Sequence, residues 1–384
     1  MLAIIPTINR LCSRIRCLKA VFQRLIRTDT LMTQIQTSSQ RRRMLRRLAT
    51  GLVLSPLVEA PTCTQARRLD APTGDIPTGF TSRHALVDGA RIHYVEGGEG
   101  PVLVLLHGWP QTWRAWRKVM PLLATDFHII AIDTPGLGDS DLPTDGYDKR
   151  SLARRIQALV SGLGHARFAL IGHDLGASIA YAYALQFPAE LTHLAVMDDP
   201  IPGLKDWDTV KGKWPRWHFA FHAIPHLPEA LVSGRELTYL NWFYGNAFQK
   251  GAITNADARL YAEAYARPAS LHAGFEYYRA FAKDAADNAA NDALLTMPVL
   301  ALGGDHSPWR SYLYEQLEGR AVLLEGDVVP DCGHFIAEEQ PAWLARKLRA
   351  FLSGKSSNDE GPSSGDGQRS HGAVPRATKN PRSE

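Results

Sequence analysis

Residues 172–176 read Gly172-His173-Asp174-Leu175-Gly176, between an apolar run at 168–171 and an alanine-rich segment that begins at residue 177. A short apolar run bounded by turn residues is typical of a buried strand, and the segment at 177–187 has helical spacing. The glycines on both sides of Asp174 allow neighbouring backbone to pack closely around a tight turn. The pattern therefore predicts an elbow that presents the Asp174 side chain between a strand and a helix.

Further apolar runs lie on both sides of this elbow, and helical patterns separate most of them. The expected strands are a hairpin at 85–87 and 91–95, followed by runs at 102–106, 128–132, 168–171, 194–197, 299–302 and 321–324. Helical spacing marks residues 113–123, 151–163, 177–187 and 341–352. This alternation predicts an α/β fold with a mostly parallel, eight-stranded sheet and helices on both faces.

The alternation stops after the sixth expected strand. Residues 198–298 are rich in Trp, Tyr, Phe and Ala and contain no strand run. Because this stretch is too long for a loop, we expect a helical insertion that lies over the strand ends as a lid. The predicted organisation is a leader at 1–66, a core at 67–202 and 291–352, a helical cap at 203–290 and a disordered tail at 353–384.

The positive charge of the chain is concentrated in the leader. The 384 residues include 43 Lys or Arg and 39 Asp or Glu, but residues 1–66 hold 11 basic residues against two acidic ones. The part that must fold is therefore acidic, which argues against a nucleic-acid partner. A basic stretch at 41–47 before the apolar residues 48–58 is typical of an export signal and loosely resembles a twin-arginine signal.

This leader predicts export to a bacterial periplasm or secretion, and the protein would be cytoplasmic without it. A signal should begin near a start codon, so we expect Met32 or Met44 to be the true start. No apolar run reaches the roughly 18 residues of a membrane-spanning helix. Of the four cysteines only Cys332 lies within the folding unit, and no pair has zinc-ligand spacing. We expect no metal and no organic cofactor.

Three further segments accompany the elbow. His107-Gly108-Trp109-Pro110 follows the strand at 102–106, residues 133–140 follow the strand at 128–132, and Asp331-Cys332-Gly333-His334-Phe335 precedes the last helix. A nucleophile, an acid and a histidine in this chain order are typical of the α/β-hydrolase fold.

Residues 85–352 resemble α/β-hydrolases of the epoxide hydrolase and dehalogenase branch, and most of all the Cif-like epoxide hydrolases. The resemblance is carried by Met197-Asp198-Asp199-Pro200-Ile201-Pro202, Trp217-His218-Phe219 and Phe275-Glu276-Tyr277-Tyr278-Arg279-Ala280. It implies a hydrolase acting on ether bonds, which uses water and no cofactor to open a neutral lipophilic epoxide to a vicinal diol. A capped hydrolase could also form a homodimer through its lid.

An aspartate at the elbow suits this chemistry. A carboxylate is anionic at pH 7 and can attack an sp³ carbon, which leaves an alkyl ester on Asp174. Water activated by His334 would then attack the ester carbonyl, and the resulting oxyanion needs preorganised donors. The elbow and the loop at 107–110 provide the backbone N–H groups of Leu175 and Trp109 for this oxyanion hole.

Two acids compete to orient His334. Asp198 follows the strand at 194–197, and Asp305 follows the strand at 299–302. The resemblance favours Asp198, because Cif-like relatives carry their acid after the earlier strand, although typically as Glu. Asp305 remains the alternative, since many other hydrolases of this fold use that placement. We expect Asp199 to be a turn residue before Pro200.

The alkoxide formed on ring opening needs acid donors opposite Asp174. The resemblance assigns this role to His218 and Tyr278. Tyr277 and Tyr278 differ by about 100° around a helix, so only one of them can face the site. The residues expected to line the substrate pocket are Trp109, Phe219 and His107.

Dehalogenation is the main alternative. Haloalkane dehalogenases typically place Trp after the nucleophile, where this chain has Leu175. Fluoroacetate dehalogenases bind the substrate carboxylate through two Arg, at positions held here by Leu175 and Ser178, and their halide-binding Trp corresponds to Phe219. A ligand-binding or signalling protein on a hydrolase fold is a second alternative, against which the retained Asp174 and His334 argue.

Overall fold

The computed structural model describes residues 76–143, 146–213, 216–267 and 269–354. The expected leader at 1–66, with its export signal and start sites, and all but the first two residues of the expected tail lie outside the described residues. None of the helices in the described part of the chain combines the length and the hydropathy needed to cross a membrane.

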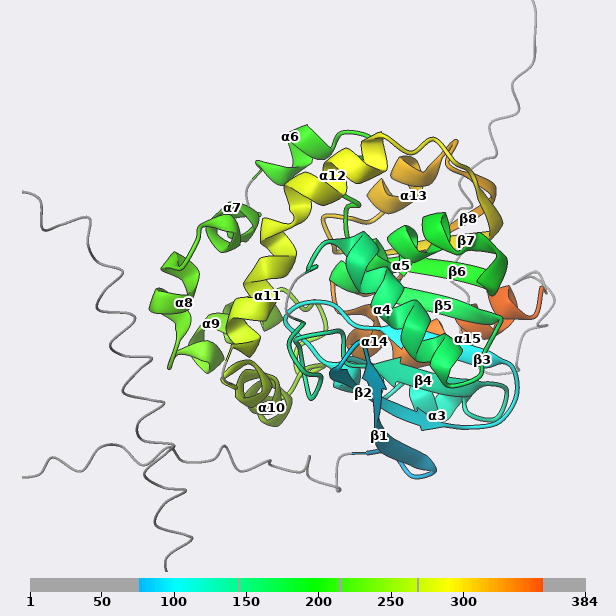
Figure 1. The fold of residues 1–384 in the computed structure, drawn as a ribbon, viewed down its shortest axis with the longest axis horizontal. Helices are drawn as coiled ribbons and strands as arrows, with labels where there is room; N and C mark the ends of the chain where they lie inside the picture. Colours follow the sequence, from blue (N-terminus) through cyan, green and yellow to red (C-terminus); the bar gives the residue numbers. More distant parts are fainter. Residues whose placement is uncertain (1–75, 144–145, 214–215, 268, 355–384) are drawn as a thin grey trace, which may run out of the picture. The chain divides into compact units, whose positions relative to one another are not determined.

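The centre of the fold is one eight-stranded sheet with the strand order β1-β2-β4-β3-β5-β6-β7-β8 (Figure 1). The pairs β1–β2 and β2–β4 are antiparallel, and all the other neighbours are parallel. The predicted mostly parallel sheet is therefore confirmed. The strands are β1 (Phe80–Val87), β2 (Ala90–Gly97), β3 (Val102–Leu106), β4 (His128–Ile132), β5 (Phe168–His173), β6 (Leu191–Met197), β7 (Leu295–Gly304) and β8 (Ala321–Val329).

Helices cover both faces of the sheet, because alternate strand side chains point to opposite faces. Val104 and Leu106 of β3 belong to a core shared with α4 and α5, whereas Leu103 and Leu105 belong to a second core with α3 and α15. Figure 1 shows α4 and α5 in front of the sheet and α15 behind it. The helices outside the insertion are α3 (Met120–Leu123), α4 (Lys149–Gly162), α5 (Leu175–Gln186), α13 (Tyr312–Leu317), α14 (Ile336–Glu339) and α15 (Pro341–Leu352).

The prediction of a single helix at 113–123 is wrong. The chain instead forms a 3₁₀ turn, η2 (Trp113–Trp116), and then the short helix α3. Pro121 lies in the first turn of α3 and has no N–H, so a continuous helix through this position would lose a hydrogen bond. Trp113 and Trp116 are both buried in the core.

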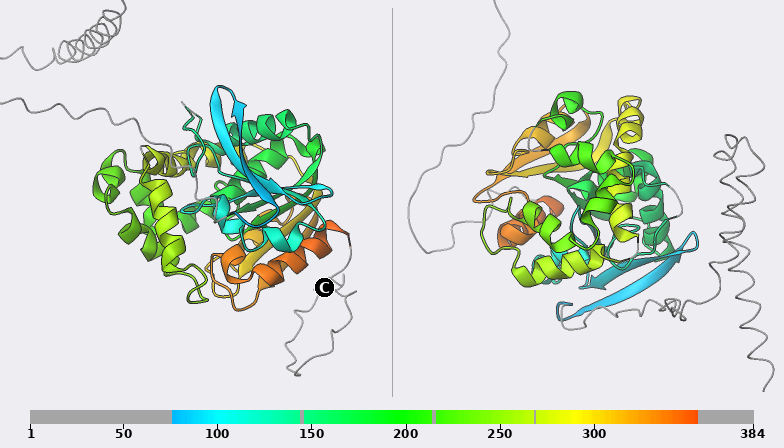
Figure 2. Two further views of the ribbon diagram at one scale, coloured as in Figure 1. Left: turned by 90° about the horizontal axis from the view of Figure 1, so that it is seen from below. Right: turned by 90° about the vertical axis from the view of Figure 1, so that its left-hand side faces the viewer.

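A helical insertion separates β6 from β7, as the sequence predicts, and Figures 1 and 2 show its members together beside the sheet. Three of its buried tyrosines donate hydrogen bonds to loops that follow β3 and β4. Tyr244 bonds the carbonyl of Pro110 at 2.7 Å, Tyr265 that of Gln111 at 3.2 Å and Tyr277 that of Pro135 at 2.7 Å. The inserted helices are α6 (Trp207–Lys211), α7 (Trp217–Ala223), α8 (Leu227–Val232), α9 (Glu236–Tyr244), α10 (Asn255–Tyr265), α11 (Ser270–Arg279) and α12 (Phe281–Ala289).

Candidate active site

The elbow at 172–176 joins β5 to α5, and Asp174 occupies its tip. Its backbone has φ 52° and ψ −129°, a strained conformation for a residue other than glycine. A Cβ added to Gly172 would lie 2.2 Å from the Gly176 carbonyl oxygen, and one added to Gly176 would lie 2.5 Å from that of Leu106. These approaches explain why both flanking residues are glycine.

The Asp174 carboxylate has donors on both of its oxygens. The backbone N–H of Trp109 donates to Oδ1 at 2.7 Å, and His334 Nε2 lies 3.5 Å from Oδ2. Burial opposes the ionisation of Asp174, but the hydrogen bond and charge of His334, with the Leu175 N–H, outweigh burial and lower the pKa. The carboxylate is therefore held in its anionic form.

His334 lies between two carboxylates. Its Nδ1 is 2.9 Å from Oδ1 of Asp198, a fully buried acid. Asp198 also accepts hydrogen bonds from the Gly304 N–H at 2.8 Å and the Ser307 hydroxyl at 2.5 Å. Burial acts to lower the pKa of His334, but its bonds to Asp174 and Asp198 outweigh this and raise the pKa well above the ordinary range.

Asp305, the alternative acid, has different partners. Its two carboxylate oxygens accept the backbone N–H groups of Asp331, at 3.0 Å, and Cys332, at 2.9 Å. These bonds brace the loop that carries His334. They also lower the pKa of Asp305, because their effect outweighs that of burial. Of the two acids, Asp198 is the one that contacts His334.

Two residues that hold the His334 loop escaped the sequence analysis. Glu339 accepts the N–H groups on both sides of His334, from Gly333 at 2.9 Å and from Phe335 at 2.8 Å. His173 Nε2 donates to the His334 carbonyl at 2.7 Å, and burial lowers the pKa of His173 to about 4. An acid on a helix and a histidine at a variable elbow position carry no distinctive sequence signal.

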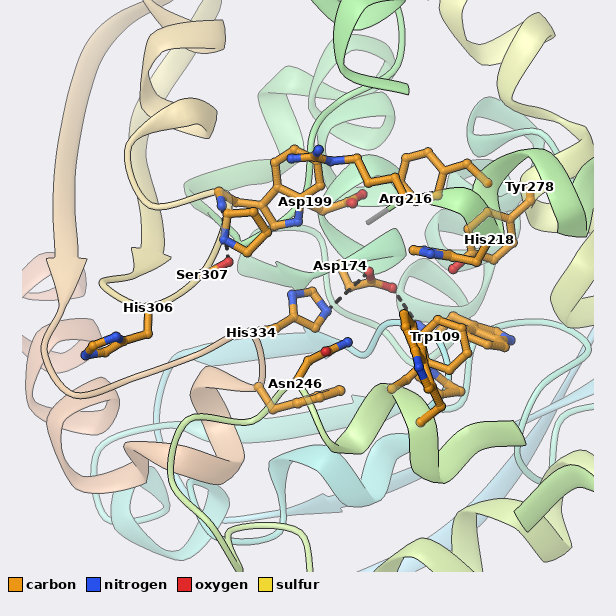
Figure 3. Close-up of a pocket in the computed structure, with 17 residues that line it drawn as sticks. Trp109, Asp174, Asp199, Arg216, His218, Asn246, Tyr278, His306, Ser307 and His334 are labelled. Atoms are coloured by element: carbon orange, nitrogen blue, oxygen red, sulfur yellow. Dashed lines mark hydrogen bonds and ion pairs between the residues drawn. The ribbon is translucent and has the colours of Figure 1, made fainter. Parts of the chain in front are cut away.

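A cavity of about 200 Å³ lies beside Asp174 (Figure 3). Much of its wall is aromatic, with Trp109, Phe219, Trp242, Phe243, Tyr278 and Trp309 among the lining residues. Trp109 and Phe219 thus line the cavity as the sequence analysis expects.

The two expected donors, His218 and Tyr278, also line the cavity. Figure 3 shows both on the side of Asp174 away from His334. Burial and the nearby Asp174 charge raise the pKa of Tyr278 well above its ordinary value, so its phenol keeps its proton. Tyr277 instead donates its hydroxyl to a loop carbonyl, so only Tyr278 of the pair faces the site.

The prediction that His107 lines the substrate pocket is wrong. It is buried, its Nδ1 bonds the Gly108 carbonyl at 2.9 Å, and its Nε2 accepts the Thr134 N–H at 3.1 Å. It is not among the residues that line the cavity beside Asp174. His107 therefore links the loops after β3 and β4 instead of lining the cavity.

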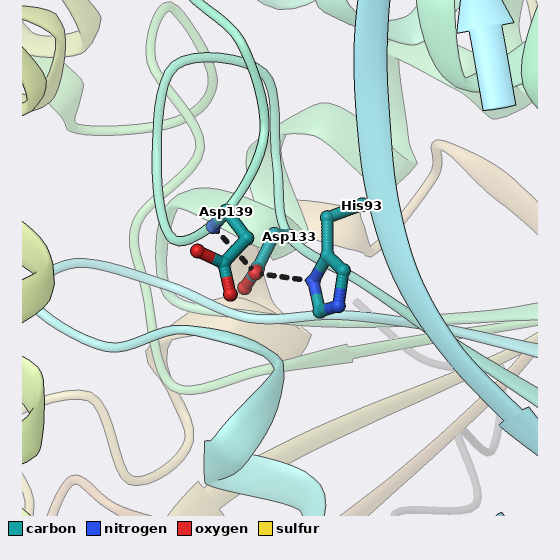
Figure 4. A group of neighbouring side chains, drawn as sticks. All are labelled: His93, Asp133 and Asp139. Carbon is teal, nitrogen blue, oxygen red and sulfur yellow. Dashed lines mark hydrogen bonds and ion pairs between the residues drawn. The ribbon is translucent and has the colours of Figure 1, made fainter. Parts of the chain in front are cut away.

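Asp133 fixes the same loops (Figure 4). Its Oδ2 lies 2.7 Å from His93 Nδ1 and accepts the Asp139 N–H at 2.9 Å, while Oδ1 accepts the Trp113 N–H at 2.8 Å. Burial opposes the ionisation of Asp133, but these partners outweigh it and lower its pKa. The group of His93, Asp133 and Asp139 therefore braces the loops that follow β3 and β4.

Asp199 and Arg216 are among the polar residues of the cavity wall that the sequence does not predict. Asp199, expected as a turn residue, is 2% exposed and lines the cavity. Arg216 also lines it, with its guanidinium 3.9 Å from the centre of the Trp309 ring. Asp199 directly follows Asp198, and the sequence pattern does not reveal that both acids point toward the site.

Comparisons with known proteins identify the family to which this fold belongs. The protein family described as the alpha/beta hydrolase fold matches residues 101–341 of the chain. The chain belongs to the α/β-hydrolase family. This hydrolase is 36% identical over 283 residues to the soluble epoxide hydrolase of Corynebacterium sp. strain C12, covering 72% of this chain and 98% of that protein.

Two other relatives of the hydrolase match a similar share of the chain. The crystal structure of Cfl2 from Burkholderia cenocepacia is 40% identical, with a TM-score of 0.68, and covers 71% of this chain and 96% of that one. The fluoroacetate dehalogenase of a Burkholderia species is 31% identical, covering 72% of this chain and 94% of that protein. The predicted family is confirmed. The proteins similar to this chain include one named as an epoxide hydrolase and one named as a fluoroacetate dehalogenase.

Proposed function

We propose that this α/β-hydrolase opens a neutral epoxide to a vicinal diol through an ester of Asp174. One observation carries the proposal: the anionic Asp174 has His334 on one side and the protonated phenol of Tyr278 on the other, beside an aromatic-walled cavity. The similarity to a soluble epoxide hydrolase supports it. The inserted helices act as a cap that supplies His218 and Tyr278.

The first step is ring opening. Oδ1 of Asp174 is held by the Trp109 N–H, so Oδ2 attacks a ring carbon of the epoxide. The bond between that carbon and the ring oxygen breaks, and Tyr278, with His218, supplies the proton that converts the alkoxide to a hydroxyl. The product of this step is a hydroxyalkyl ester on Asp174.

The second step is ester hydrolysis. His334 Nε2 removes a proton from water, which attacks Cγ of Asp174, and the negative charge develops on Oδ1. The N–H groups of Trp109 and Leu175 stabilise this oxyanion, with about 3 kcal/mol expected from each donor. Collapse of the intermediate breaks the bond from Cγ to the ester oxygen, which takes the proton from His334 and leaves as the diol. One water oxygen stays on Asp174, and the second water proton restores the Tyr278 phenol. Asp198 stabilises the imidazolium that His334 becomes between these proton transfers.

Esterification itself prepares His334 to act as the base. Two carboxylates, Asp174 and Asp198, raise the pKa of His334 in the free protein. The ester of Asp174 is uncharged, so one of these two stabilising charges is lost and the pKa of His334 falls. The neutral imidazole that activates water is therefore favoured only after ring opening.

Dehalogenation of an anionic substrate is the second candidate, favoured by the similarity to a fluoroacetate dehalogenase. The residues that follow the nucleophile argue against it. Leu175 and Ser178 carry no charge, and the Ser178 hydroxyl lies 3.4 Å from Oδ2 of Asp199. A substrate carboxylate would find no cation at either of these two positions, and would lose the charge-assisted partners that Arg supplies there in fluoroacetate dehalogenases.

A turnover assay tests the proposal. The purified protein is incubated with a panel of epoxides and, separately, with fluoroacetate, while diol and fluoride are measured. We expect diol formation that Asp174→Asn abolishes, and no fluoride. Fluoride release that depends on Asp174, without diol formation, would overturn the proposal in favour of dehalogenation.

A further inference from the structure

The Asp199 side chain is a buried carboxyl group on the cavity wall that the two proposed steps do not use. It is 2% exposed, and among the described residues it accepts one hydrogen bond, from the Ser178 hydroxyl at a long 3.4 Å. A buried polar group with poor partners costs about 1–3 kcal/mol. Because Asp199 lines the cavity, a bound molecule can supply the missing partner.

Arg216 is the second polar group on this wall. Its guanidinium packs on the face of Trp309, and its Nε is buried without a hydrogen-bond partner in the described part of the chain. Burial lowers the pKa of Arg216, while its interactions with Tyr312 and Asp199 act to raise it. Figure 3 shows Arg216 beside Asp199, on a wall that is separate from His334 and Trp109.

The chemistry of these two groups restricts what can bind between them. Burial and the Asp174 charge raise the pKa of Asp199 well above its ordinary value, with Asp198 adding to the effect and His334 and Lys149 opposing it. A protonated carboxyl both donates and accepts hydrogen bonds, whereas a guanidinium only donates. An alkyl group would leave both side chains unpaired, and a carboxylate would be repelled by Asp174. A hydroxyl group satisfies both, since it accepts from Arg216 and exchanges a hydrogen bond with Asp199.

We propose that Asp199 and Arg216 form a polar subsite that selects epoxides carrying an uncharged hydroxyl group on the chain attached to the ring. The aromatic wall then holds the hydrocarbon part of the substrate, and the subsite holds its hydroxyl. This inference rests on the proposed function, because it takes Asp174 to attack the epoxide ring.

The test compares three epoxides of equal chain length: 1,2-epoxyhexane, 5,6-epoxyhexan-1-ol and 5,6-epoxyhexanoate. For the wild type we expect kcat/KM to be about tenfold higher for the hydroxyl compound than for the alkyl compound, and lowest for the carboxylate. Asp199→Leu, which keeps the branching at Cγ but has no polar atoms, should reduce the hydroxyl-to-alkyl ratio to about one. Asp199→Asn keeps a donor and an acceptor and should retain most of the preference.

A matched control and a second variant keep the test decisive. The Asp292 side chain is 95% exposed, so Asp292→Asn should leave the ratio unchanged. If Leu at position 199 prevents folding, Arg216→Met keeps an apolar stem on Trp309 and should likewise reduce the ratio. Equal ratios in the wild type and in the folded variants would overturn the subsite, even though turnover of 1,2-epoxyhexane would leave the proposed function intact.

A binding measurement distinguishes failure of the subsite from failure of the proposed function. Three tryptophans line the cavity, so their fluorescence reports binding of hexane-1,2,6-triol or hexane-1,2-diol to the protein. If no epoxide is turned over, the proposed function fails, but a preference for the triol that Asp199→Leu abolishes would still support the subsite. An equal affinity for triol and diol would overturn it.

Discussion

His334 contacts Asp198, with Nδ1 2.9 Å from Oδ1, although Asp305 follows the neighbouring strand. Gly304 and Ser307 hold the Asp198 carboxylate in place for this contact, whereas Asp305 bonds the backbone of the loop before His334. The ends of two neighbouring strands, β6 and β7, thus provide one acid that orients the imidazole and another that orients the loop.

The two acids should therefore respond differently to the same substitution. Asp198→Asn removes the charge that stabilises the His334 imidazolium, so we expect kcat to fall roughly 10³-fold. Asp305→Asn keeps one acceptor for the loop, and should lower kcat by less than about tenfold. Steady-state diol formation measures both, and equal losses in the two variants would contradict the assignment of Asp198.

The Tyr278 hydroxyl should act only in ring opening. Tyr278→Phe removes a proton donor, so we expect formation of the ester to slow by about 10²-fold, with ester hydrolysis unchanged. Rapid-quench mass spectrometry separates the two steps. Tyr277→Phe is the matched control: it loses a buried hydrogen bond to Pro135 and about 1 kcal/mol of stability, but neither chemical step should change. A slower hydrolysis step in Tyr278→Phe would contradict this role.

The two steps should differ in their dependence on pH. The pKa of Asp174 is below its ordinary value, so the nucleophile stays ionised and ring opening is constant across neutral pH. Ester hydrolysis needs neutral His334, and should therefore slow as the pH falls through the pKa of His334 in the ester form. The fraction of protein present as ester during turnover should rise on acidification. A fraction that does not change with pH would show that His334 is not the base.

Glu339 should support both stability and catalysis. Its carboxylate accepts backbone N–H groups on each side of His334 and also those of Phe248 and Gln249. Glu339→Gln replaces one acceptor oxygen with a donor, so we expect a loss of about 3 kcal/mol in the free energy of unfolding, measured by urea denaturation. Glu318→Gln, on an exposed residue, should change stability by less than about 0.5 kcal/mol. Equal stabilities would contradict the proposed bracing of the loop.

The sequence predicts the sheet well where burial is uniform. β3 and β4 have the predicted bounds because every residue in them is apolar or lies at a clear end. β1 and β8 are longer than predicted, since their exposed edge positions carry polar residues that interrupt the apolar pattern. Pro121 prevents one continuous helix over residues 113–123, and a count of apolar spacing does not take the missing N–H of proline into account.

Within the site, the sequence predicts the residues that belong to recognisable motifs. It does not predict those whose role depends on where the backbone directs the side chain. Asp174 and His334 belong to ordered motifs, and they lie together. His107 and Asp199 each neighbour a motif residue, but His107 bonds the loop after β4 without lining the cavity, whereas Asp199 lines the cavity wall. The contacts of Arg216 with Trp309 join segments far apart in the chain, and no local pattern predicts them.

The central claim is the ester on Asp174, and trapping it is the most direct test. His334→Gln removes the base, so an epoxide mixed with this variant should add its entire mass to the protein, on the peptide that contains Asp174. The same treatment of an Asp174→Asn, His334→Gln double variant should add nothing. An adduct located away from Asp174, or one formed from fluoroacetate with loss of fluoride, would contradict the account.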